Sequence, residues 1–171
     1  EIKPSSGHPR IILSRDYLPA FKENIKSEEL AKMYDACLSL ADEELDCDMQ
    51  GTKNDSTLLK KIKARAIAYV AGSRDESHGR QTVEYMKKYM STCYYSPTVG
   101  DITRNIGDCM FTGALVYDWC YDLLTASDKE FFIRQFKTLS AAKEIGYPPT
   151  KMINISGHSV EQEIFQDLLS A

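Results

Sequence analysis

The stretch from residue 105 to 124, NIGDCMFTGALVYDWCYDLL, limits the possible folds more than any other part of the chain. Apolar residues lie on nearly every side of a helix drawn through it, which is typical of a helix enclosed by neighbouring elements. The chain has 171 residues, of which 43% are hydrophobic, so it can form a core around such a helix. We therefore expect a single domain, 1–171, built around a core helix over 105–124.

Apolar side chains recur at helical spacing in the rest of the chain, and no segment shows the sustained alternation that predicts strands. This pattern predicts an all-α fold. Antiparallel helix pairs are expected, as in part of an incomplete α/α toroid or in an α-solenoid. Besides 105–124, the spacing predicts helices over 14–25, 27–41, 58–71, 81–93 and 127–139, and a last one from His158.

Polar residues and glycines predict where these helices begin and end. Gly72 is expected to end the helix over 58–71, and the polar segments 47–57 and 73–79 are expected to be loops. Ser127 and Glu130 have the spacing of a capping box, in which the two residues bond each other's backbone at a helix start.

Charge and hydropathy argue against two classes of partner. The net charge of -4 and the pI near 5.4 give no electrostatic footprint for a nucleic acid. No run of about 18 apolar residues is present, so no membrane span is expected. The start EIKPSSGHPR is that expected of a mature exported chain whose signal peptide has been removed.

The five cysteines include no CxxC pair, so a zinc-ribbon site is not expected. Cys109 and Cys120 lie inside the apolar stretch, where a buried free thiol is the favoured interpretation. The use of disulfides is left open. Neither a cofactor nor a metal is expected within these residues.

The chain has three histidines. His8 is expected to have a surface or docking role, because it lies near the chain end, and His78 is expected to be solvated among charged residues. His158 stands at a helix start with Glu161 three residues later, so the carboxylate can orient the imidazole or act as an acid beside it. A helix start with an ordinary His–Glu contact is the alternative.

Arg104 stands between a glycine-containing loop and the core helix. Its guanidinium is expected either to bond Asp101 or Asp108 nearby or to point into a cleft toward a carboxylate or sulfate.

Three aromatic residues of the core stretch, Tyr117, Trp119 and Tyr121, fit sugar stacking but are favoured as core residues. Tyr94 and Tyr95 fall in a predicted loop and are expected to be more accessible.

Four segments, in this order and at these separations, resemble the amino-terminal helical part of the heparinase II/III-like polysaccharide lyases of bacteria. The resemblance extends over most of the chain and is weakest from Cys37 to Tyr94. The segments are HPRIILSRDYLPAFK, GDITRNIGDCMFTGALVYDWCYD, IGYPP and GHSVEQEIFQDLLSA.

The resemblance implies an enzyme that cleaves heparin and heparan sulfate by β-elimination. It places active-site residues at His158 and Glu161 through GH-x-x-E, and at Arg104 through GDITR. Elimination removes a weakly acidic proton beside a uronate carboxylate, so the site must neutralise that carboxylate and stabilise the developing charge. We expect Glu161 to neutralise the carboxylate, His158 to transfer the proton or bind the carboxylate, and Arg104 to bind a sulfate or carboxylate.

The resemblance also implies that residues 1–171 are an amino-terminal piece of a longer enzyme and are inactive alone. The family's later helices, its β-sandwich domains, a catalytic tyrosine, a second active-site histidine and a structural metal site would lie beyond this piece. We expect an acidic polysaccharide as partner and a periplasmic or secreted location. A possible homodimer would form through the apolar surface left for the later helices.

Two alternatives remain open. The chain can belong to a lyase for another uronate polymer such as alginate, because a fold does not fix the substrate. It can also be a non-catalytic helical module that binds a saccharide or a protein. In a lyase, Arg104, His158 and Glu161 should converge on one groove. In a module, His158 should bond Glu161 inside a closed core, with Arg104 paired to an aspartate.

Overall fold

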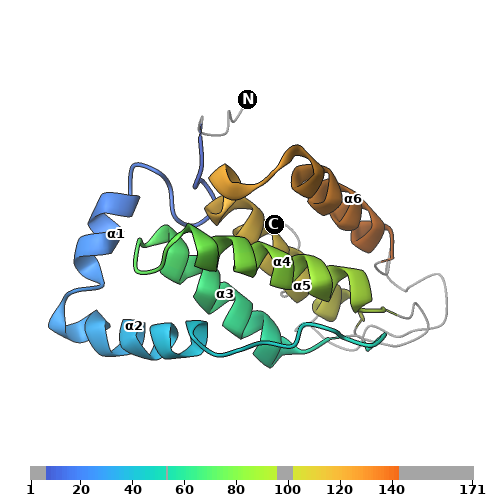
Figure 1. Ribbon diagram of the computed structural model, residues 1–171, viewed down its shortest axis with the longest axis horizontal. Coiled ribbons are helices and arrows are strands. Elements are labelled where there is room, and N and C mark those ends of the chain that lie inside the picture. Colours follow the sequence, from blue (N-terminus) through green and yellow to red (C-terminus); the bar gives the residue numbers. More distant parts are fainter. Residues whose placement is uncertain (1–6, 53, 96–101, 143–171) are drawn as a thin grey trace.

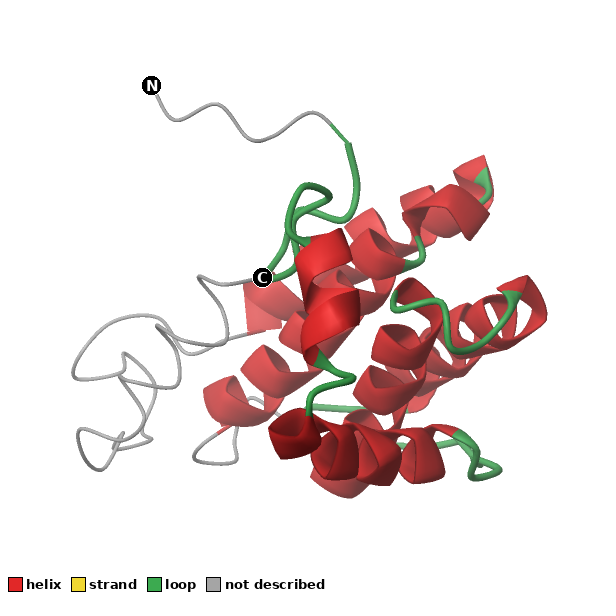
Figure 2. Ribbon diagram, turned by 90° about the vertical axis from the view of Figure 1, so that its left-hand side faces the viewer, coloured by secondary structure: helices red, strands yellow, loops and turns green. Residues whose placement is uncertain are grey.

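The computed structural model describes residues 7–52, 54–95 and 102–142. In these residues it contains six α-helices, a short 3-10 helix and no strand (Figures 1 and 2). The predicted all-α fold class is confirmed for this part of the chain, whereas the helix expected from His158 lies outside the described residues. The helices are α1 (Leu18–Asn24), α2 (Glu28–Ala41), α3 (Ser56–Val70), α4 (Glu76–Thr92), α5 (Ile102–Trp119), η1 (Tyr121–Leu123) and α6 (Ala126–Ala142).

Helices α3 and α5 form the centre of the molecule. Helix α3 packs against α2, α4 and α5, and α5 packs against α3, α4 and α6. In Figure 1, α1 and α2 lie on one side of this centre and α6 on the other. The expected core helix is confirmed, because buried side chains follow one another around α5, but it ends at Trp119 and not at residue 124, and the 3-10 helix η1 follows it. The largest fully buried apolar side chains in the described residues include Tyr89, Phe132, Leu59, Ile62, Met86, Ile106 and Val116.

Side-chain caps explain where three helices begin. Ser27 accepts a hydrogen bond from the Leu30 amide, and Asp55 accepts one from the Leu58 amide at 2.9 Å. Asp75 caps α4 in the same way, accepting from the His78 amide at 3.0 Å. Helix α4 therefore begins at Glu76, and the prediction of a loop over 73–79 was wrong for its second half.

Gly79 lies inside α4 although glycine is a poor helix former. A Cβ atom on Gly79 would lie 2.6 Å from Leu123 and 2.8 Å from the ring of Tyr69. The close approach of α4 to these side chains requires the glycine, so its presence does not indicate a loop.

The capping box of α6 is shifted from the predicted position. Thr125 and Asp128 bond each other's backbone, with the Thr125 amide donating to the Asp128 carboxylate at 3.0 Å and the Asp128 amide donating to the Thr125 hydroxyl at 3.2 Å. Lys87 of α4 pairs with the same carboxylate at 2.7 Å. The prediction of Ser127 and Glu130 was wrong, because Asp128 also bonds α4 and Glu130 is exposed.

Arg65 of α3 is buried and ties three helices together. Its guanidinium donates to the Ala41 carbonyl oxygen at 2.5 Å and to the Glu43 carbonyl oxygen at 3.3 Å, at the carboxyl end of α2. It also contacts His78 at 3.3 Å and donates to the side-chain oxygen of Gln81, both on α4. His78 is therefore half-buried beside a cation, and the prediction that it is solvated was wrong.

The position of His78 makes stability depend on pH. Burial, followed by the charges of Arg65 and Arg74, lowers the pKa of His78 below its usual 6.5, against a smaller opposing effect of Asp42 and Asp75. Below pH 6.5 the unfolded chain therefore binds more protons at this position than the folded chain does, so folding stability falls as the pH falls from 7 to 5. His78→Gln keeps an acceptor for Arg65 and should flatten this dependence in urea unfolding measured at several pH values. An unchanged slope would contradict the assignment.

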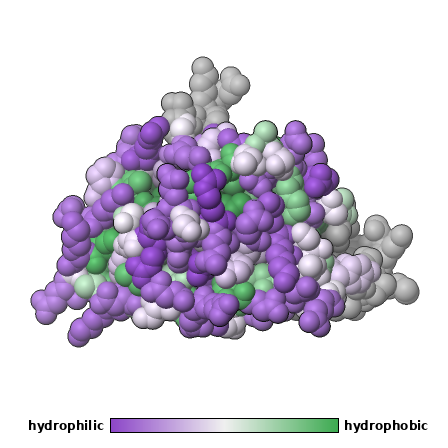
Figure 3. All heavy atoms as spheres, in the orientation of Figure 1, coloured by the Kyte–Doolittle hydropathy of each residue, from purple (hydrophilic) through white to green (hydrophobic). Residues whose placement is uncertain are grey.

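The face shown in Figure 3 is largely hydrophilic, with hydrophobic residues scattered between charged ones. On the described residues visible in this view, the hydrophobic side chains form no continuous surface of the kind expected for later helices. Among the helices of the described residues, none is both long and apolar enough to cross a membrane.

Candidate functional site

The described residues include one of the three predicted site residues. Arg104 lies in the first turn of α5, and its side chain is half-buried. His158 and Glu161 lie outside the described residues, so the predicted convergence of the three side chains stays a prediction.

A charged pair links α5 to α3 one turn beyond Arg104. Asp108 of α5 pairs with the ammonium group of Lys63 at 3.2 Å, and the same ammonium lies 5.9 Å from the ring centre of Phe111. The carbonyl oxygen of Asp108 accepts from the Thr112 hydroxyl at 2.8 Å. The amino-terminal half of α5 therefore presents Arg104 next to a fixed ion pair and a ring.

The thiols of Cys93, after α4, and Cys109, in the first half of α5, are in contact. Cys109 donates a hydrogen bond to Cys93, which lowers the pKa of Cys93 and raises that of Cys109. Burial raises the pKa of Cys120 to about 12, and the predicted buried free thiols at Cys109 and Cys120 are confirmed. Tyr95 is buried beside the pair, so the prediction that it is accessible was wrong.

At the opposite end of α5, Asp118 organises the start of the described chain. Its carboxylate accepts hydrogen bonds from the backbone amides of Arg10 and Ile11, each at 2.8 Å, and from the ring of His8. The indole N–H of Trp119 donates to the Ile11 carbonyl oxygen at 3.0 Å. The segment HPRII is thereby joined to VYDW, and the docking role predicted for His8 is confirmed.

Aromatic rings extend this junction. The ring of His8 stacks on Tyr121 at 3.6 Å between centres, and Tyr117 meets Tyr121 edge-on at 5.6 Å. The ammonium group of Lys129 also lies over the ring of Tyr121, 3.6 Å from its centre. Trp119 is buried, as expected of a core residue. Tyr117 and Tyr121 are half-buried, and their rings contact the ring of His8.

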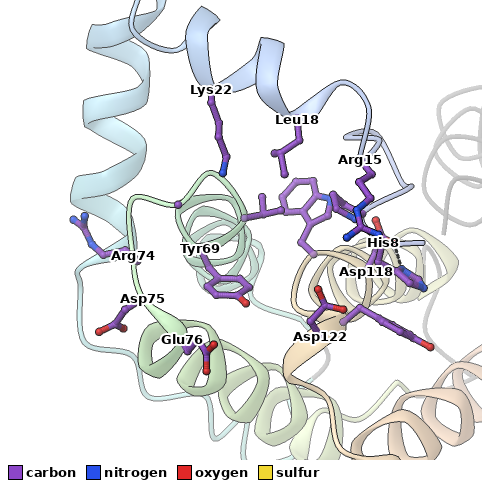
Figure 4. A pocket seen from close by; sticks show the side chains of 15 residues that line it. His8, Arg15, Leu18, Lys22, Tyr69, Arg74, Asp75, Glu76, Asp118 and Asp122 are labelled. Atoms are coloured by element: carbon purple, nitrogen blue, oxygen red, sulfur yellow. Dashed lines mark hydrogen bonds and ion pairs between the residues drawn. The ribbon is translucent and has the colours of Figure 1, made fainter. Parts of the chain in front are cut away.

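A cleft of about 490 Å³ opens beside the junction (Figure 4). The first turns of the chain and α1 form one wall, with Arg15 and Lys22. The turn between α3 and α4 and the end of α5 form the other, with Glu76 and Asp122, and Tyr69 and Trp119 lie between the walls. Sequence reasoning missed this cleft, because its residues come from four separate segments, 8–9, 15–22, 69–76 and 118–122.

The described residues contain no group of three or more histidine, cysteine, aspartate or glutamate side chains that could hold a metal ion. A scan against models of known protein families finds no match for the chain, and a comparison with curated proteins finds no significant relative.

Proposed function

We propose that this chain is the amino-terminal helical part of a polysaccharide lyase that cleaves heparin and heparan sulfate by β-elimination. The observation that carries the proposal is the resemblance of four ordered segments to the heparinase II/III-like lyases. The proposal includes a toroid completed by later helices, β-sandwich domains beyond residue 171, and a periplasmic or secreted location.

The junction at Asp118 supports the proposal. Two of the four segments, HPRIIL and VYDWCYD, are more than a hundred residues apart in the sequence, yet Asp118 and Trp119 bond directly to Arg10 and Ile11. This direct contact gives a structural reason for the two segments to occur in the same chain.

The position of Arg104 also fits the proposed chemistry. The start of a helix has unbonded amides and a positive dipole end, both of which favour an anion. Arg104, in the first turn of the 18-residue helix α5, adds a planar donor fork suited to a carboxylate or sulfate. In the proposed site Arg104 binds such a group of the substrate.

The remaining roles fall to His158 and Glu161. A base removes the proton beside the uronate carboxylate, and the electron pair left behind forms a carbon–carbon double bond. The glycosidic oxygen leaves with the electron pair of its broken bond and takes up a proton to become a hydroxyl. Glu161, protonated, donates to the carboxylate and stabilises the enolate-like charge, while His158 moves a proton or binds the carboxylate. A protonated acid near a substrate carboxylate needs a raised pKa, which the approach of two carboxyl groups produces.

The test is a lyase assay on the whole natural protein that contains this chain, with heparin, heparan sulfate and alginate as substrates. The ultraviolet absorbance of unsaturated uronate is the readout. We expect activity on heparin and heparan sulfate, reduced about 100-fold or more by His158→Ala and about tenfold or more by Arg104→Ala.

Arg134→Ala is the matched control, because Arg134 is an exposed arginine of α6 to which the proposal gives no role. It should leave the rate unchanged. Activity on alginate alone would show that the substrate is alginate and not heparin or heparan sulfate. An absence of activity on every uronate polymer would overturn the proposal.

A further inference from the structure

The cleft beside the Asp118 junction holds charges that the protein itself does not neutralise. Of its cations, Arg74 is paired with Asp42, at 2.7 Å and 2.5 Å through two nitrogens. The side chains of Arg15 and Lys22 make no hydrogen bond or ion pair with any residue in the described part of the chain. Figure 4 shows both side chains on the wall formed by the first turns and α1, with Lys22 extending toward the turn after α3.

Most acids of the cleft are already bonded. Asp118 is bonded to the HPRII segment, Asp75 caps α4, and Glu76 pairs with Arg80 at 3.8 Å. Among the lining carboxylates, Asp122 makes no hydrogen bond or ion pair with the described residues. The side chains of Arg15 and Lys22 therefore face the cleft without a carboxylate partner, so the wall formed by the first turns and α1 can bind an anionic group.

The floor between these charges is aromatic. Trp119 uses its indole N–H to hold Ile11, so only its ring can serve a ligand. Burial raises the pKa of Tyr69, whose hydroxyl therefore stays protonated at neutral pH and can donate. Flat rings below a cleft are suited to the apolar face of a sugar ring.

We infer that this cleft is a second saccharide site that binds one acidic sugar unit, a hydroxyl-rich ring carrying a carboxylate or sulfate. The inference rests on the proposed function for its ligand class. Arg15 and Lys22 bind the anionic group, Asp122 and the Tyr69 hydroxyl bond sugar hydroxyls, and the rings contact the sugar face. The cleft volume of about 490 Å³ is within the usual range for small-molecule sites.

The cleft lies at the opposite end of α5 from Arg104, which is the one residue of the proposed catalytic site within the described part of the chain. Fifteen residues of α5 separate Arg104 from Trp119, which corresponds to about 22 Å along the helix axis. The cleft would therefore hold a part of the acidic polysaccharide remote from the bond that is cleaved, and would strengthen the binding of long chains without taking part in the reaction.

Fluorescence provides a direct test, because Trp119 is the only tryptophan among the 171 residues. Glucuronate, glucose and inorganic sulfate are titrated separately into this chain. We expect a saturable change in the Trp119 emission with glucuronate and much weaker binding of glucose and sulfate. Sulfate binding as tight as that of glucuronate would reduce the cleft to a simple anion site and overturn the inference, as would the absence of any saturable change.

Variants locate the effect. Lys22→Ala and Arg15→Ala should each weaken glucuronate binding about tenfold, because each removes a charged hydrogen bond. Lys26→Ala is the control, since Lys26 is an exposed lysine near α1 that is paired with Glu23 at 2.7 Å. Equal weakening by Lys26→Ala would contradict a defined site. The binding measurement needs no catalysis, so the two proposals can fail separately. Glucuronate binding without lyase activity would overturn the proposed function alone. Lyase activity without glucuronate binding would overturn this inference alone.

Discussion

Asp118→Ala is expected to lower the free energy of unfolding by about 3 kcal/mol, because it leaves three partly buried donors without an acceptor. The Asp118 side chain has no exposed surface, and it bonds the amides of Arg10 and Ile11 as well as His8. These bonds hold the segment against α5, so their loss also weakens its attachment to the helix. Urea unfolding followed by circular dichroism measures the loss.

Asp122→Ala is the matched control, since Asp122 is an exposed aspartate one helical turn away. It should change stability by no more than about 0.5 kcal/mol. Limited proteolysis adds a local readout, because Asp118→Ala should expose the chain around Arg10 to cleavage under native conditions. A loss below about 1 kcal/mol without new cleavage would show that the junction contributes little.

Arg65→Ala is expected to have an effect of similar size, about 3 kcal/mol. The substitution removes the donors for the Ala41 and Glu43 carbonyl oxygens, which end α2 and have no partner within that helix. It also removes a cation from the negative dipole end of α2 and the contact with the ring of Tyr85, 5.1 Å from the guanidinium carbon.

Lys60→Ala provides the comparison, because Lys60 is an exposed cation on the same helix. Lys60→Ala should change the free energy of unfolding only slightly. Arg65→Lys should recover only part of the stability, since one ammonium cannot replace the fork of donors that reaches both α2 and α4. If Arg65→Ala unfolds at the same urea concentration as Lys60→Ala, the proposed tie between α2, α3 and α4 is wrong.

The all-α class was predictable because apolar residues at helical spacing indicate which side of each helix faces the core. The enclosed helix α5 was the clearest case, and the helix predicted over 27–41 matches α2. The start of α4 was missed because Gly79 resembled a loop residue. Only the packing of Leu123 and Tyr69 against it, which is a tertiary contact, explains a glycine there.

The buried polar residues were harder to predict. Arg65 lies in KKIKARA, where the neighbouring lysines indicate a solvent-exposed face. Its side chain is buried because the end of α2 packs over it, which the sequence around Arg65 does not indicate. Asp118 left a signal that could have been used, because an aspartate inside an apolar helix needs partners. The cleft left none, because it depends on how the HPR segment folds back onto α5.

The most direct measurement is the mass of the smallest products that the whole natural protein releases from heparan sulfate. A lyase forms a double bond in place of adding water, so we predict products lighter by one water than those of hydrolysis, with unsaturated uronate at their new non-reducing ends. Saturated products that have taken up water, or intact heparan sulfate, would contradict the assignment of this chain to a uronate polysaccharide lyase.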